Sequence, residues 1–243
     1  MHEAVCNLLH DDVRVMALAM TGSAARNEGS FDSDLDYNVF FVADAPAQAI
    51  LAEIEATVKR TMNIDAAADV GRFFDLDLHA APTTFAARPR GWTDGPDDFE
   101  LEIGNTFVHT HLIFEREAFF TQAQARYLPY YEEPLRQERL AVTLRFCHNN
   151  INHITPYVQR GLYFQAFRRL YDATREFLQA LFIAKRTYPI AYDKWVKKQL
   201  VEILDLPELY GEFVKLYEVQ KLESEELTQK GAHLQALIAA YVE

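Results

Sequence analysis

The chain has 243 residues, 49% hydrophobic and 25% charged, a composition that suits one large soluble domain or two smaller ones. Its net charge of −12 disfavours a nucleic-acid partner because an acidic surface repels phosphate groups, and its longest apolar runs, 15–20 and 177–184, are too short to cross a membrane. The first twelve residues contain three acids and no lysine or arginine, and the two cysteines have no metal-ligand spacing, so the predicted location is the reducing cytoplasm.

The first half of the chain begins with two strand patterns and a helix pattern. Residues 13–20 form an apolar, β-compatible stretch that ends at Gly22, and residues 35–42 form a second strand rich in Val, Phe and Tyr. Asp44 is the expected N-cap of the next helix, which runs to about Met62. Strands mixed with helices in this way are typical of an α+β or α/β domain.

Three further segments complete this half. Residues 72–80 alternate in part between polar and apolar side chains, which predicts a strand. Residues 82–98 hold three prolines and two glycines and are expected to form a loop, and residues 106–114 form the last predicted strand. We therefore predict that residues 1–130 form an α+β domain with a mixed sheet.

From about Pro134 onward the apolar residues recur at helical spacing. The recurring positions in the first two predicted helices are Leu140, Leu144, Cys147, Ile151, Ile154, Tyr163, Phe167, Leu170, Thr174, Phe177 and Leu181. Further helices are predicted over 192–204, 207–219 and 223–242. Helices with short connections are typical of a bundle, so residues 131–243 are predicted to form an all-α helical domain with these stripes as its core.

The most informative stretch joins the first two strands. A strand ends in Gly22 and Ser23, and after ten intervening residues Asp34 and Asp36 flank one leucine at the start of the next strand. Residues two apart on a strand project on the same face, so these two carboxylates lie side by side and repel unless a cation lies between them. Mg²⁺ prefers a few carboxylates together with phosphate oxygens, and glycine lets backbone N–H groups approach a ligand closely.

A third acid is available on the strand predicted over residues 72–80. Asp75, Asp77 and His79 share one face of that strand, and either aspartate could join the pair on the neighbouring strand. Three carboxylates can hold two metal ions that stabilise the attacking and leaving oxygens of an in-line displacement. Asp77 is our first choice and Asp75 the second.

The Gly-Ser pair, about ten residues and then Asp-x-Asp resemble the signature of the nucleotidyltransferase superfamily related to DNA polymerase beta. The resemblance implies a palm-like domain, two Mg²⁺ ions, and transfer of a nucleoside monophosphate from an NTP such as ATP. It implies Asp34, Asp36 and Asp77 as catalytic acids and metal ligands. A helical domain carrying Tyr188-Pro189 and Lys194-Trp195 is similar to those of aminoglycoside and lincosamide nucleotidyltransferases.

Five residues are expected to bind the nucleotide, and for two of them another interpretation stays open. They are Gly22, Ser23, Arg26, Ser33 and Lys194. Arg26 either contacts phosphate or offsets Glu28 and Asp32. Lys194 either contacts phosphate or is a solvated helix residue.

The acidic residues are concentrated in the first half of the chain. Residues 1–115 hold 20 acidic and 7 basic side chains, whereas residues 116–243 hold 16 and 17. Such a field attracts cations, so the expected acceptor is a small hydroxylated molecule of the polycationic antibiotic type. A protein hydroxyl is the alternative acceptor, and a nucleotide-sensing protein without turnover is the non-enzymatic alternative. The sequence does not indicate the oligomeric state.

Overall fold

The computed structural model describes residues 2–29, 34–61 and 76–243, which divide into two compact units. The first unit comprises Met1–Phe85 and Glu102–Leu128, and the second comprises Ala86–Leu101 and Pro129–Glu243. Residues 86–101, which the sequence pattern assigns to the first domain, pack within the second unit. Within the described residues, no helix has the length and apolar character that a membrane span requires.

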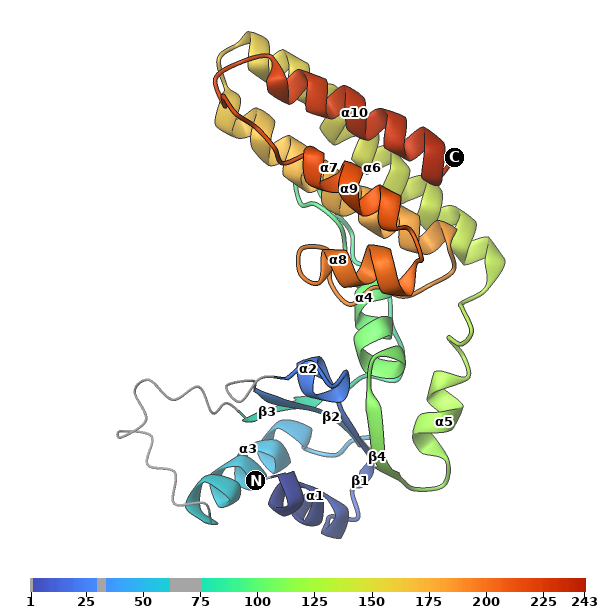
Figure 1. The fold of residues 1–243 in the computed structure, drawn as a ribbon. Helices are drawn as coiled ribbons and strands as arrows, with labels where there is room; N and C mark the ends of the chain where they lie inside the picture. The colour runs from blue at the N-terminus through green and yellow to red at the C-terminus, as the bar shows by residue number, and fades with distance from the viewer. Residues whose placement is uncertain (1, 30–33, 62–75) are drawn as a thin grey trace. The chain divides into compact units, whose positions relative to one another are not determined.

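The fold is α+β, as the sequence predicted, with a four-stranded mixed sheet in the first unit and helices in the second (Figure 1). The strands are β1 (Val15–Met20), β2 (Leu35–Phe41), β3 (Leu76–Ala80) and β4 (His111–Glu115), in the spatial order β3-β2-β1-β4. Strand β1 is antiparallel to β2 and to β4, whereas β2 and β3 are parallel.

One face of the sheet is covered by helices α1 (His2–Asp11) and α3 (Ala47–Thr61). Val5 from α1, Leu18 from β1 and Ile54 from α3 belong to one cluster of buried side chains, which is the core of this unit. Apolar residues at helical spacing on α3 and alternating apolar residues on the strands together produce this core.

The other face of β2 packs against aromatic residues. Phe40 lies on that face, and its ring is 6.1 Å from Phe107 and 5.4 Å from Phe120, measured between centroids. These partners lie on the π-helix η1 (Gly104–Val108) and on helix α5 (Phe119–Gln124). Successive side chains of a strand point to opposite faces of the sheet. Asp36 lies four residues before Phe40 and therefore shares this face.

Two local predictions in this unit need correction, and some short elements were not predicted. The strand predicted over 106–114 is η1 followed by β4, because Phe107 is drawn into the aromatic cluster against Phe40. Asp44 adopts a φ of 63° rather than capping a helix, and α3 begins at Ala47. The amphipathic helix α1 and the short helix α2 (Gly22–Ala25) were not predicted, and neither was α4 (Phe99–Ile103), whose first three residues belong to the second unit.

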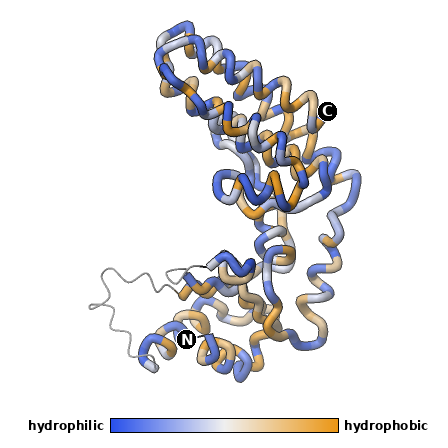
Figure 2. Tube along the Cα trace, viewed as in Figure 1, coloured by the Kyte–Doolittle hydropathy of each residue, from blue (hydrophilic) through white to orange (hydrophobic). Residues whose placement is uncertain are grey.

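The second unit is built mainly from helices. They are α6 (Glu133–Gln159), α7 (Tyr163–Ala184), α8 (Val196–Lys198), η2 (Gln199–Ile203), α9 (Pro207–Lys215) and α10 (Glu226–Tyr241). Helices α6 and α7 lie side by side and α10 packs on both (Figure 1). Apolar residues recur along all three (Figure 2), and Cys147, Leu170 and Phe177 are fully buried among them. This confirms that the predicted stripes contribute to the core, except for the half-buried Leu140, which lies outside this cluster.

A buried ionic network explains why residues 86–101 belong to the helical unit. Arg139 on α6 donates hydrogen bonds to both carboxylate oxygens of Asp97 and to both of Glu100. Arg90 donates to a carboxylate oxygen of Glu176 on α7 at 2.5 Å. Asp97 is 7% exposed and Glu100 and Glu176 are fully buried, so each of these charges depends on its partner.

Candidate metal centre

Two adjacent strands bring three possible metal ligands together. In the parallel pairing of β2 with β3, Asp36 lies opposite Asp77 and Asn38 lies opposite His79. Because side chains two apart share a strand face, His79 lies on the same face as Asp77. One ligand atom from each of Asp36, Asp77 and His79 falls within 4.8 Å of the other two, and His79 Nε2 is 3.8 Å from Asp77 Oδ2.

The electrostatics of this group favour a cation. Burial raises the pKa of Asp36, and the negative charges of Asp77 and Asp34 raise it further, while the nearby His79 and Arg26 lower it. Ionised Asp36 is therefore destabilised by its neighbours, and a positive ion among them would relieve that repulsion. The Asp77 and His79 side chains are more than half exposed, so the group is open to solvent.

The Gly-Ser turn lies directly against the Asp-x-Asp strand. Gly22 has a φ of +68°, and a Cβ at this position would lie 2.0 Å from Oδ2 of Asp36. The Thr21 N–H donates a hydrogen bond to the Asp36 carbonyl at 2.9 Å. Glycine is therefore required here both by the backbone conformation and by the space that the Asp36 carboxylate occupies.

A carbonyl from the π-helix is hydrogen-bonded both to the residue that follows β1 and to the middle of β2. The Thr21 hydroxyl donates to the Asn105 carbonyl at 2.9 Å, and the Asn38 side-chain amide donates to the same oxygen at 3.1 Å. Thr21 and Asn38 are both buried. Single π-helical turns occur often at functional sites, and here η1 is hydrogen-bonded next to Gly22 and to the strand that carries Asp36. Sequence reasoning missed these residues because it placed a strand where η1 forms.

The predicted site residues are not all brought together. Asp34 is exposed immediately before β2, near enough to raise the pKa of Asp36 but outside the group of three converging ligands. Ser23 lies in the short helix α2. Lys194 is exposed in the second unit, where its carbonyl accepts a hydrogen bond from Gln199. Ser33 and Asp75 lie outside the described residues.

Arg26 follows α2 and has an acidic partner. Its Nε donates to Glu28 Oε2 at 2.8 Å, and the two side chains are 10% and 13% exposed. Of the two interpretations that the sequence left open for Arg26, an interaction with Glu28 is observed. The positive charge of Arg26 also lowers the pKa of Asp36, so it acts on the candidate metal group.

The donor set suits a divalent ion, with one difference from the expected site. Two carboxylates and an imidazole converge, whereas the sequence analysis expected carboxylates alone. Oxygen ligands suit Mg²⁺, while an imidazole nitrogen suits Mn²⁺, Zn²⁺ and other transition metals better. The alternation of residues 72–80 places His79 on the same strand face as Asp77, but its approach to Asp36 depends on the register between β2 and β3, so it was not predicted as a ligand.

No protein-family model matches this chain, and no curated protein sequence matches it. Among solved structures, the chain is similar to a nucleotidyltransferase-like protein from Exiguobacterium sibiricum 255-15. The two share 13% sequence identity with a TM-score of 0.46, over 98% of this chain and 73% of that chain. An identity and a TM-score this low carry no argument about activity, so function has to be argued from the residues of this chain.

Proposed function

We propose that the chain is a metal-dependent nucleotidyltransferase that transfers a nucleoside monophosphate, from ATP or another NTP, to a hydroxyl of a small acceptor. The observation that carries the proposal is the contact between the Gly22 turn and Asp36, with Asp77 paired to Asp36 across the two strands. A turn for phosphate and carboxylates for a cation thus meet at one edge of the sheet, as transfer from a metal-bound triphosphate requires.

In this proposal Asp34, Asp36 and Asp77 hold two divalent ions, with His79 as an added ligand. Bound ions would neutralise charge that develops on the phosphate oxygens during displacement. Gly22 and Ser23 contribute backbone N–H groups and a hydroxyl toward the triphosphate, and Gly22 has room for this because it lacks a side chain.

The rest of the first unit contributes position and charge. Hydrogen bonds from Thr21 and Asn38 to the Asn105 carbonyl tie the turn after β1 and the middle of β2 to the π-helix. Rigid placement of reacting groups lowers the barrier to transfer. His79 and, to a smaller extent, Arg26 supply positive charge that lowers the pKa of Asp36. Ser33 and Lys194 stay predicted nucleotide contacts, and the acidic first half of the chain favours a cationic hydroxylated acceptor.

The test is transfer of label from α-³²P-ATP, or from another NTP, to a panel of aminoglycosides, lincosamides and other hydroxylated amines, with pyrophosphate release measured in parallel. The matched control is Asp36→Asn, which keeps the size of the side chain. Pyrophosphate release that needs both an acceptor and a divalent ion, and that disappears in the variant, supports the proposal. Absence of transfer to every acceptor would leave the rival below.

A second candidate is a protein that binds nucleotide and metal without turnover. It is favoured by one observation, the position of Asp34 outside the group formed by Asp36, Asp77 and His79. Calorimetry with ATP, with and without divalent ion, separates the two candidates when combined with the transfer assay. Metal-dependent ATP binding without any transfer would favour the sensor, and equal ATP affinity in EDTA would count against both.

A further inference from the structure

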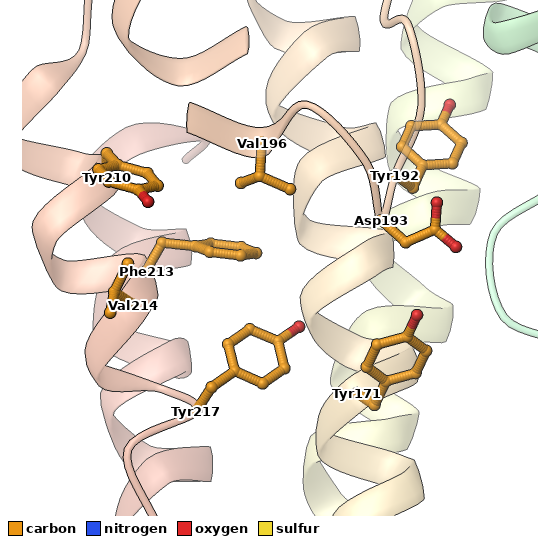
Figure 3. A pocket seen from close by; sticks show the side chains of 8 residues that line it. All are labelled: Tyr171, Tyr192, Asp193, Val196, Tyr210, Phe213, Val214 and Tyr217. Carbon is orange, nitrogen blue, oxygen red and sulfur yellow. The ribbon is translucent and has the colours of Figure 1, made fainter. Parts of the chain in front are cut away.

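The helical unit contains an open pocket of about 350 Å³ that is lined mostly by aromatic rings. Figure 3 shows Phe213 and Tyr217 projecting from α9 and its C-terminal end toward Tyr171 on α7. Four tyrosines, one phenylalanine and two valines form the walls, and Asp193 is the one acidic residue among them. All lining residues are described, and they include no lysine, arginine or histidine. A volume of this size is in the range of small-molecule sites.

The rings contact one another and a neighbouring hydroxyl group. The centroids of Tyr171 and Tyr217 are 6.4 Å apart with the rings at 71°, and those of Phe213 and Tyr217 are 5.7 Å apart. The Tyr217 hydroxyl is hydrogen-bonded to the Thr174 hydroxyl. Burial raises the pKa of Tyr217 to about 12, so this ring is uncharged at neutral pH. A ligand would therefore meet preformed, electron-rich ring faces.

Two of these rings already lie near cations of the chain. The Arg175 guanidinium carbon is 5.6 Å from the centroid of Tyr171, and Lys197 Nζ is 5.9 Å from that of Tyr210. Both distances are within the range of cation–π attraction. Neither cation lines the pocket, and Arg175 lies 3.9 Å from the Asp172 carboxylate, which offsets its charge.

The carboxylate of Asp193 adds a negative charge to the aromatic wall. It is exposed, and within the described part of the chain it has no hydrogen bond or ion pair. Its negative charge raises the pKa of Tyr217 slightly, whereas the positive charge of Arg175 lowers the pKa of the same residue by more. Rings and a carboxylate together attract positive charge, whereas a phosphate or carboxylate ligand would find no basic partner in the lining.

We propose that this pocket binds a small organic cation, an ammonium group carried on a compact apolar body. The ammonium would lie among the faces of Tyr171, Phe213 and Tyr217, with Asp193 at its side, and the valines would contact the apolar body. A neutral aromatic ligand could stack on the rings but would make no charge interaction with the Asp193 carboxylate. The site does not depend on nucleotidyl transfer, so it stands or falls separately from the proposed function.

Choline and its neutral carbon isostere, 3,3-dimethylbutan-1-ol, provide the test because they share a shape and differ by one charge. The full chain is titrated with each, and the methyl resonances of Val196 and Val214, which line the pocket, are followed by NMR. We expect saturable shifts with choline and binding of the alcohol that is about tenfold weaker. Equal affinities would show a merely apolar pocket and overturn the proposal, as would the absence of saturable shifts.

Two variants locate the attraction. Asp193→Asn should lower choline affinity several-fold without changing that of the alcohol, whereas the control Asp205→Asn, at an exposed acid that does not line the pocket, should change neither. Tyr171→Phe keeps the ring and should keep binding, while Tyr171→Leu removes the π face and should weaken it about fivefold or more. Unchanged choline affinity in Asp193→Asn would overturn the assignment, and circular dichroism checks that each variant is folded.

Discussion

Two groups of acidic side chains in this protein have opposite environments. In the sheet unit, Asp36 and Asp77 face each other at a solvent-exposed strand end, and their charges disfavour one another. In the helical unit, Asp97 and Glu100 are buried, and both are hydrogen-bonded to Arg139. Both groups add to the net negative charge of the protein. The buried acids are paired with an arginine, whereas the positive charges near Asp36 do not offset the repulsion from its acidic neighbours.

The pKa values of Asp97 and Asp36 are shifted in opposite directions. Burial alone would raise the pKa of Asp97, but the hydrogen bonds and charge of Arg139 lower it overall. The pKa of Asp36 is raised by burial and by its acidic neighbours, and nearby positive charge does not offset this. A group of acids that the protein neutralises itself stabilises the fold, whereas one that it leaves uncompensated can bind a cation.

The largest expected effect comes from removing the charge of Asp36. Asp36→Asn keeps the contact with Gly22 but removes a carboxylate that we propose as a metal ligand, so nucleotidyl transfer should fall by about 10²–10⁴-fold. Pyrophosphate release with the identified acceptor is the measurement.

The stability of the same variant sharpens the comparison. In metal-free buffer Asp36→Asn should unfold at the same temperature as the wild type or higher, because a repelled charge is gone. Turnover close to the wild-type level would remove Asp36 from the metal site, and marked loss of stability would place it with the structural acids instead.

The parts of the site that lie close together in the sequence could be predicted from it. An apolar strand that ends at Gly22, and an Asp-x-Asp that opens the next strand, are visible within one short stretch, and both strands are confirmed. The contribution of His79 could not be predicted in the same way. It depends on the parallel register between β2 and β3, which a long intervening segment leaves undetermined in the sequence.

The fold could not be predicted where long-range contacts decide local structure. Residues 106–108 have strand-like composition, yet they belong to η1 because Phe107 packs on Phe40. The loop over 82–98 is confirmed as irregular, but its place in the helical unit depends on Asp97 and its pairing with Arg139. Neither contact leaves a periodic signal along the chain.

The second largest effect is expected for the buried group. Arg139→Met leaves Asp97 and Glu100 inside the helical unit without the cation that bonds both, and should lower the free energy of unfolding by about 3–5 kcal/mol. Denaturant titration followed by circular dichroism measures the change. The control is Arg136→Met, one turn earlier on α6, where the partner Glu133 is exposed and little change is expected. Equal effects of both variants would contradict a structural role specific to the buried pair.

A smaller effect concerns which ion the exposed group prefers. His79→Asn removes the imidazole beside Asp77 and should weaken Mn²⁺ binding about tenfold, with Mg²⁺ binding nearly unchanged because Mg²⁺ prefers oxygen ligands. Electron paramagnetic resonance of free Mn²⁺ and calorimetry with Mg²⁺ measure the two affinities. His10→Asn, at an exposed histidine on α1, is the matched control. If Mn²⁺ affinity does not change in His79→Asn, the imidazole is not a ligand.

The smallest effect uses one glycine from each unit. Gly22→Ala places a Cβ 2.0 Å from Asp36 Oδ2 at a φ of +68°, so the carboxylate must move and the backbone is strained. We expect a loss of about 1–2 kcal/mol in stability together with weaker metal binding. Gly211, inside α9, has nothing within 4 Å of the point where a Cβ would lie, so Gly211→Ala should instead stabilise the helix by about 0.5–1 kcal/mol.

The stability changes of the two variants are expected to have opposite signs, negative for Gly22→Ala and positive for Gly211→Ala. Thermal unfolding of both variants, with and without Mn²⁺, measures them. In the sheet unit, glycine is needed because the Asp36 carboxylate occupies the space where a side chain would be, whereas in α9 no neighbour requires it. A Gly22→Ala variant that is as stable as the wild type and binds Mn²⁺ equally well would mean that the turn does not constrain Asp36. The link between the Gly-Ser turn and the metal group, on which the proposed transfer depends, would then be lost.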